Sequence, residues 1–113
     1  MHIFNQTRGT SLITQGRIAD TFWLRLRGLL GTTSLQPGDG LILVGEKSIH
    51  TLFMRYAIDV VYVNKNQIVL RSDSNMVPYR LGPFVTQSAY ILEMPVGTIV
   101  NTKTQVGDQL RFE

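Results

Sequence analysis

Short apolar runs separated by turn residues dominate the hydrophobic pattern of the chain, and this pattern is typical of short β-strands. The turn NQTRG separates the first two runs, and its Gly9 can adopt a positive φ without a steric penalty. Asn64, Lys65 and Asn66 interrupt a later pair of runs, which predicts a β-hairpin. The predicted strands cover residues 2–5, 10–14, 41–45, 48–59, 59–70 (as the hairpin), 89–93, 98–102 and 109–113.

One segment has helical periodicity instead. Residues 17–30, RIADTFWLRLRGLL, place most of their apolar side chains on one side of a helix and most polar ones on the other. Gly31 follows at a position where helices commonly end, and Arg25 and Arg27 suit the negative end of the helix dipole. The segment therefore predicts one amphipathic helix, with Trp23 in the core.

Many short strands with one helix predict a mainly-β (α+β) fold, a small barrel-like or rolled antiparallel sheet with the amphipathic helix packed against it. The 113 residues, of which 43% are hydrophobic, are enough to fill one core, so we expect a single domain over residues 1–113. The longest irregular segment that the pattern predicts is residues 72–88. A loop of this length is often a binding loop or a lid.

The composition argues against several classes of site. The chain has no cysteine, and its histidines are His2 and His50, so no metal site is expected within one chain. It contains neither a P-loop nor a G-x-G-x-x-G motif, and no cofactor is expected. The net charge of +3 comes from basic residues scattered along the sequence. Without a basic cluster and interleaved aromatic residues, nucleic acid is a less favoured partner.

The N-terminal residues give an expectation about location. They lack a basic region followed by a long apolar run, and no stretch of the chain reaches the length of a membrane span. We therefore expect a cytoplasmic protein without a membrane span. Its partner, a small molecule or a protein, and its oligomeric state do not follow from the sequence.

The polar residues of SIHTLFMRYAID (residues 48–59) stand out in a run that would otherwise be buried. In a strand, alternation would put His50 and Met54 on one apolar face, and Thr51 and Arg55 on the other. A histidine on an apolar face is commonly a core residue with one hydrogen bond. It can also line a pocket and titrate near neutral pH, and both alternatives stay open for His50.

Two acidic residues also lie inside apolar runs, Asp59 before VVYV and Glu93 in ILEMPVG. A buried carboxylate is unfavourable unless it is paired or accepts hydrogen bonds from backbone N–H groups. We interpret both residues as structural, and Arg25, Arg55 and Arg80 are candidates to bind them.

Several motifs occur together in a specific order: RLRGLLG (25–31), PGDGLILV (37–44), SIHTLFMRYAIDVVYVN (48–64), YILEMPVGT (90–98) and GDQL (107–110). In this order they resemble the prokaryotic family of domain of unknown function 192, also called uncharacterised protein family 0127. The family pattern matches at Arg25, Gly28, Leu29, Leu30, Gly40, Leu41, His50, Thr51, Met54, Ile58, Asp59, Leu92, Glu93, Pro95 and Gly97. The resemblance implies a compact, mainly-β, barrel-like domain with a packed helix, and it implies no established activity.

Three functional hypotheses follow. The first is a non-enzymatic binding module for a small polar or anionic ligand or for a partner peptide. Its ligand-binding candidates are Arg25, His50, Thr51, Met54 and Arg80. The second is a small hydrolase or isomerase that uses His50 with Asp59 or Glu93, and the third is weak RNA binding through arginines. We prefer the first because the chain has no cysteine and no G-x-S-x-G nucleophile motif, and catalytic residues stay unassigned.

Overall fold

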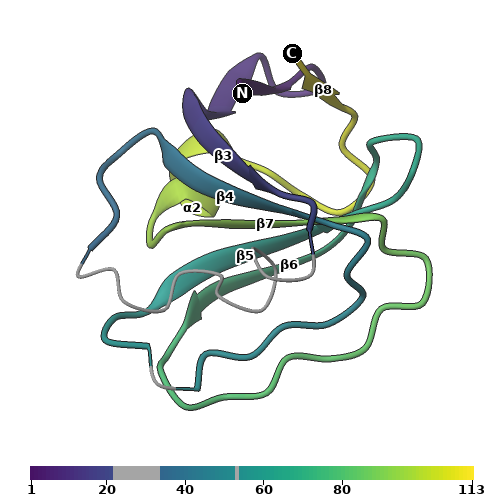
Figure 1. Cartoon of the computed structure of the whole chain (residues 1–113). Helices are drawn as coiled ribbons and strands as arrows, with labels where there is room; N and C mark the ends of the chain where they lie inside the picture. Colours follow the sequence, from purple (N-terminus) through teal and green to yellow (C-terminus); the bar gives the residue numbers. More distant parts are fainter. Residues whose placement is uncertain (22–33, 53) are drawn as a thin grey trace.

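The computed structural model describes residues 1–21, 34–52 and 54–113. Its elements are β1 (Ile3–Asn5), β2 (Thr10–Ile13), β3 (Gln15–Ala19), β4 (Asp39–Val44), β5 (Ile58–Val63), β6 (Val69–Met76), β7 (Tyr90–Pro95), α2 (Thr98–Thr102) and β8 (Leu110–Phe112). The strands form a three-stranded sheet in the order β2-β1-β8 and a five-stranded sheet in the order β3-β4-β7-β5-β6 (Figure 1). The mainly-β prediction is confirmed.

The sheets differ in detail from a small antiparallel barrel. Within the described ranges they form two open sheets and no closed barrel. The β3–β4 pair is parallel, whereas the other pairs among the named strands are antiparallel. Gly16 and Gly40 are partners in the parallel register. A Cβ on Gly40 would lie 2.4 Å from Cδ1 of Ile13, so the glycine makes room for that buried side chain.

The helix prediction is wrong at its beginning, because Gln15–Ala19 forms β3 instead. Hydrogen bonding to β4 stabilises the extended backbone of β3. The local hydrophobic periodicity cannot indicate this pairing, because β4 lies more distant in the sequence. Residues 22–30 of the predicted helix, with Trp23 and Arg25, lie outside the described residues.

The strand predicted at residues 98–102 is also wrong, since Thr98–Thr102 forms the five-residue helix α2. Gly97 precedes it with a φ of 100°, and the Asp59 carboxylate accepts hydrogen bonds from the N–H groups of Gly97 (3.2 Å) and Ile99 (2.9 Å). Asp59 belongs to β5, and the hydrogen bonds that its carboxylate accepts at the start of α2 outweigh the β propensity of TIVNT. In the part of the chain that the structure describes, no helix is long and apolar enough to cross a membrane.

Residues 48–52 and 54–57 do not form the predicted strand. His50 makes an isolated β-bridge with Leu81, and β5 begins only at Ile58. Between them the backbone turns, with Met54 N donating to Thr51 O at 3.1 Å. The alternation of faces expected for a strand therefore does not apply to this segment. The hairpin prediction is confirmed, with β5 and β6 on either side of the Asn64 turn.

The core has two parts, one on each face of the five-stranded sheet. On one face the small sheet and α2 contribute Ile3, Ile13, Leu110 and Ile99, packed with Leu92 and other residues of the larger sheet. On the other face, apolar loop residues pack against the larger sheet. The buried members of this second cluster are Ala19, Leu41, Leu43, Ile49, Met54, Ile58, Val60, Tyr62 and Ile91.

Candidate functional site

Two long loops cross the second face of the larger sheet. We call residues 47–52 and 54–57, between β4 and β5, and residues 77–88, between β6 and β7, the loop pair. β4 and β5 both pair antiparallel with β7, so they run parallel, and the loop between them must cross from one end of the sheet to the other. The same holds for β6 and β7, which both pair antiparallel with β5. Figure 1 shows the two loops running side by side below the sheet.

Backbone hydrogen bonds join the two loops along their length. Val85 N donates to Lys47 O at 2.7 Å, and Gly82 N donates to Ile49 O at 2.8 Å. Thr51 N donates to Arg80 O at 2.8 Å. The loop pair thus resembles a short two-stranded ribbon rather than two independent loops, and this pairing limits its conformational freedom.

Thr51 is the central residue of the loop pair. Its side chain is fully buried, and its hydroxyl donates to Val77 O at 2.7 Å and accepts from Arg80 N at 2.9 Å. Its carbonyl accepts from Tyr79 N at 2.9 Å. These contacts all lie within the protein, so the geometry assigns Thr51 a structural role. A ligand contact of Thr51 stays a prediction.

The other candidate residues occupy different environments. His50 and Arg80 are exposed, and each lies on a different loop of the loop pair. Met54 is 7% exposed and packs in the second core cluster. His50 Nδ1 accepts a hydrogen bond from Leu52 N at 3.2 Å. The exposure of His50 contradicts the core alternative. Arg25 lies outside the described residues.

Large apolar side chains project from the loop pair into solvent. Tyr79 is 60% exposed, Leu81 77% and Phe84 71%, all within six consecutive residues. The charged residues of the loop pair are basic, namely Lys47, Arg55 and Arg80, with no aspartate or glutamate. This surface is therefore both apolar and positively charged, and exposed apolar groups that are held in place commonly mark an interaction site.

Asp59 is fully buried where β5 meets the start of α2, on the opposite face of the larger sheet from the loop pair, and its carboxylate is occupied. In addition to the N–H groups of Gly97 and Ile99, it accepts a hydrogen bond from Asn75 N at 2.9 Å. These three bonds connect β5 to β6 and to α2, and they satisfy a carboxylate that would otherwise be costly to bury. No arginine in the described ranges is bonded to Asp59.

Glu93 is buried in a different way. It lies on β7, the central strand, between Leu41 of β4 and Val60 of β5, and it is 5% exposed. No hydrogen bond or ion pair joins its carboxyl group to another side chain or backbone group of the described residues. Burial raises the pKa of Glu93 from its ordinary value of 4.5 to about 7. This carboxyl group is therefore partly protonated at neutral pH.

Tyr62 lies on the same face as Glu93 and is fully buried on β5. Its hydroxyl has no hydrogen-bond partner among the described groups. Burial and then the charge of Asp73 raise the pKa of Tyr62 to about 12, with a smaller contribution from Glu93 and an opposing effect of Arg71. Arg71 and Asp73 form an ion pair with each other, with Arg71 Nε 2.9 Å from Asp73 Oδ2.

The residues of the enzyme hypothesis lie in separate environments within the described part of the chain. In the described part of the chain, no hydrogen bond joins His50 to Asp59 or Glu93, and the Asp59 carboxylate already accepts three backbone N–H groups. Residues 1–21, 34–52 and 54–113 also contain no group of three His, Asp or Glu side chains that could hold a metal ion.

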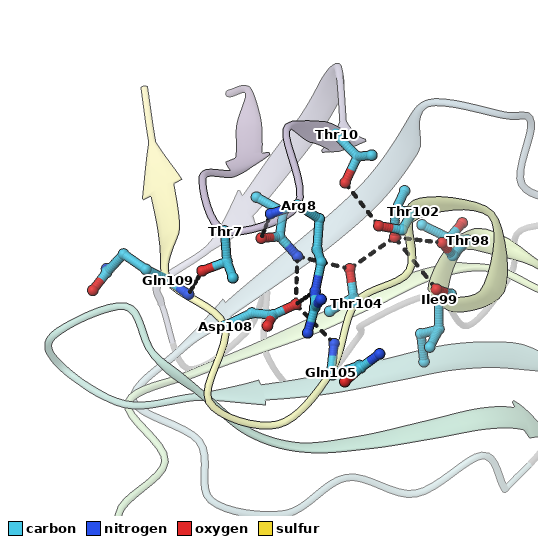
Figure 2. Close-up of polar contacts among 11 residues, drawn as sticks. Thr7, Arg8, Thr10, Thr98, Ile99, Thr102, Thr104, Gln105, Asp108 and Gln109 are labelled. Carbon is cyan, nitrogen blue, oxygen red and sulfur yellow. Dashed lines mark hydrogen bonds and ion pairs between the residues drawn. The ribbon is translucent and has the colours of Figure 1, made fainter.

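A second polar cluster lies between the small sheet and α2, far from the loop pair (Figure 2). Asp108 is 2% exposed, and its Oδ2 accepts from Asn5 Nδ2 (3.0 Å), Arg8 Nε (3.1 Å) and Gln105 N (2.9 Å). Burial alone would raise the pKa of Asp108, but the hydrogen bonds from Arg8, Asn5 and Gln105 hold it below its ordinary value. The cluster is satisfied and fastens the N-terminal turn to the C-terminal segment.

The sequence pattern missed two features of the site. Tyr62 lies in the run VVYV, where an aromatic residue is expected to be core, and nothing local shows that its hydroxyl is unbonded. Tyr79, Leu81 and Phe84 belong to the segment predicted as a binding loop, but the pattern did not single them out. The sequence signal that could have identified them is the presence of large apolar residues among Pro78, Gly82 and Pro83. Turn residues favour an exposed loop, so apolar side chains between them are expected to face solvent.

Sequence comparison places this fold in a known family. The model of the family DUF192, described as "Uncharacterized ACR, COG1430", matches residues 3–112. The chain belongs to this family. The UPF0127 protein PF1050 of Pyrococcus furiosus is 34% identical to this DUF192 chain over 116 residues, which cover 97% of each protein. A UPF0127 protein of Thermococcus sibiricus is 32% identical over 115 residues, 98% of this chain and 74% of the relative.

Two solved structures share the DUF192 fold described above. A protein of unknown function from Novosphingobium aromaticivorans has a TM-score of 0.84 and 18% identity, with coverage of 98% of this chain and 82% of that one. A Sinorhizobium meliloti protein, named as a candidate transcription regulator, has a TM-score of 0.81 and 20% identity, covering 97% of this chain and 89% of its own. At this level of identity the likeness shows the fold alone.

Proposed function

We propose that residues 1–113 act as one domain, a non-enzymatic binding module whose loop pair docks an acidic segment of a partner protein that also carries apolar side chains. The observation that carries the proposal is the exposure of Tyr79, Leu81 and Phe84 on a loop that backbone hydrogen bonds hold in place. A surface that is already ordered loses little conformational entropy when a partner binds.

The charge of the loop pair supports an acidic partner. Lys47, Arg55 and Arg80 contribute three positive charges, equal to the net charge of +3 of the whole chain, so the remaining residues are neutral on balance. Arg55 and Arg80 are exposed. An acidic partner would be attracted, and the apolar side chains would then supply most of the contact energy.

The test is a fluorescence-anisotropy titration with two labelled probe peptides of equal length, one of alternating Glu and Leu and one of alternating Lys and Leu. We expect the Glu-Leu peptide to bind, and its affinity to fall as salt is raised. The double substitution Leu81→Ser and Phe84→Ser removes two apolar contacts and should weaken binding about tenfold or more. Arg80→Glu should weaken it as well.

Control variants change similar groups away from the loop pair. Val106→Ser alters an exposed apolar residue near β8, and Lys65→Glu reverses an exposed charge at the turn of the β5–β6 hairpin. Both should bind the Glu-Leu peptide as the parent protein does. Equal loss in the controls, or equal binding of the two peptides, would contradict the proposal. If oligouridylate bound instead and the apolar double variant were unaffected, the surface would be an RNA-binding one.

A further inference from the structure

β6 is an edge strand of the larger sheet, and part of its outer side has no strand partner. The strand order β3-β4-β7-β5-β6 pairs β6 with β5 on one side (Figure 1). At the start of β6, Val69 N donates to Asp108 O at 2.9 Å, and Val69 O accepts from Gly107 N at 2.8 Å. In the part of the chain that the structure describes, the backbone of residues 70–74 makes no such bond on the outer side. An edge of this kind can pair with an added strand.

The other edge strands offer less for such pairing. β2, β3 and β8 have three to five residues each, whereas β6 has eight. The N–H groups of Leu110 and Phe112 on β8 already donate to the backbone and the side chain of Gln67. On β3, Gly16 N donates to Met1 O at 2.9 Å. β6 is therefore the longest and most accessible of these edges.

Two opposite charges lie on β6, on either side of Ser72. Arg71 Nε donates to both carboxylate oxygens of Asp73, at 3.0 and 2.9 Å. The side chain of Arg71 is 51% exposed and that of Asp73 is 25% exposed. Residues two apart in a strand point to the same face, so the two charges form one row along the edge. A row with a positive charge before its centre and a negative charge after it is complementary to itself in the antiparallel direction.

We propose that the β6 edge pairs antiparallel with the β6 edge of a second copy of this chain, about a two-fold axis at Ser72. In this register Arg71 of each copy lies opposite Asp73 of the other, and the four charges alternate in sign. Directly opposite residues have Cβ atoms about 4.5–5.5 Å apart, which allows two ion pairs between the copies. A two-fold interface uses the same surface on both copies, and the charges of β6 meet this requirement.

The charges also select the register. A two-fold axis at Arg71 or at Asp73 would place like charges opposite each other, which is unfavourable. The register of β6 on β5 is regular over residues 71–73 and shifts on both sides of them. Such irregularities at an edge limit how far a second strand can pair. The pairing is therefore short, and it ends in a closed dimer because the two-fold axis uses up both edges.

Sedimentation velocity at protein concentrations from about 10 μM to about 1 mM tests the pairing. We expect the mass to rise from that of one chain, 12.7 kDa, toward twice this value. A short edge contact buries little surface, so the expected Kd is on the order of 100 μM. Added salt should weaken the association, because exposed charges contribute to it.

Two charge variants isolate the contact between copies. Arg71→Asp places acidic residues at both positions, and Asp73→Arg places basic residues at both, so each variant alone should associate about tenfold or more weakly. An equimolar mixture of the two variants again sets opposite charges across the axis and should dimerise as the parent does. Neither variant retains the ion pair within β6, so recovery in the mixture reports the contact between copies. Circular dichroism checks that both variants are folded.

A matched control changes a similar pair at another edge. Arg111 of β8 forms an ion pair with Glu113 at 3.4 Å, and Arg111→Asp should dimerise as the parent does. The inference goes beyond the partner surface of the loop pair, so the variant with Leu81→Ser and Phe84→Ser should also dimerise normally, even though it loses the Glu-Leu peptide.

Four results would overturn the proposal. They are a parent protein that stays at the mass of one chain up to 1 mM, parent-like association of the single charge variants, a mixture of these variants that stays monomeric, and loss of the dimer in the loop-pair variant. The last result would place the contact between copies on the loop pair instead of on β6.

Discussion

The hydroxyl of Thr51 donates a 2.7 Å hydrogen bond to the backbone carbonyl of Val77 and so fastens one crossing loop to the other. The same oxygen accepts a hydrogen bond from Arg80 N. The sequence suggested Thr51 as a ligand contact, whereas in the structure its side chain joins the two loops of the loop pair. Exposed His50 and Arg80 are held on the surface of this arrangement. The surface is preorganised, and binding would require little rearrangement.

Thr51→Val should test the fastening directly. Valine keeps the shape of threonine but removes the hydroxyl, so the N–H of Arg80 and the carbonyl of Val77 lose a buried partner. We expect a loss of about 1–3 kcal/mol in the free energy of unfolding, measured by urea denaturation. Amide hydrogen exchange at Tyr79 and Arg80 should also become faster. Thr86→Val in the same loop changes an exposed hydroxyl and should have almost no effect; an equal loss in both variants would show that Thr51 has no special role.

Asp59 provides a second test, because one carboxylate connects three backbone segments. Asp59→Ala would leave the N–H groups of Asn75, Gly97 and Ile99 without their acceptor. We expect a loss of about 3 kcal/mol or more in unfolding free energy, together with loss of protection in α2. Asp59→Asn keeps one acceptor oxygen and should lose less. The matched control is Asp39→Asn, whose carboxylate accepts one N–H, that of Gln36. If Asp59→Ala were no worse than this control, the capping interpretation would be wrong.

The parts of the fold that local chemistry determines were predictable from the sequence. In the β5–β6 hairpin, Asn64 Oδ1 accepts from the N–H groups of Asn66 and Ile68, both at 2.9 Å, and so builds the turn from its own side chain. Gly9 adopts the expected positive φ, at 71°. These features depend on residues a few positions apart, which a sequence pattern can report.

The parts that depend on distant partners were not predictable. β3 is extended because Gly16 and its neighbours pair with β4, and TIVNT is helical because Asp59 caps it from about 40 residues away. In the site, the sequence suggested His50 and Arg80 separately, but only the fold shows that they share one loop pair. The unbonded state of the Tyr62 hydroxyl likewise has no local signal.

Asp108 offers a pH test at the other end of the molecule. Hydrogen bonds from Arg8, Asn5 and Gln105 lower its pKa in the folded state, so the stabilisation they provide is present above the ordinary aspartate value of 3.8. It is lost as pH falls through the lowered folded-state pKa. Asp108→Asn should therefore be less stable than the parent at pH 7, with a difference that shrinks at acidic pH. Urea denaturation at several pH values measures this, and a difference that did not depend on pH would contradict the charge-assisted role of Asp108.

Glu93 should have the opposite pH dependence. Burial raises its pKa from 4.5 to about 7, so the protonated form is favoured in the folded protein. Stability that is fully present below pH 4.5 should be lost as pH rises to about 7, by about 3 kcal/mol in total. Glu93→Gln cannot ionise and should escape this loss, so the variant should equal the parent at pH 4 and exceed it in stability at pH 8. Glu113→Gln, an exposed control, should follow the parent at every pH. A parent protein as stable at pH 8 as Glu93→Gln would mean that the folded protein solvates or pairs the Glu93 carboxylate.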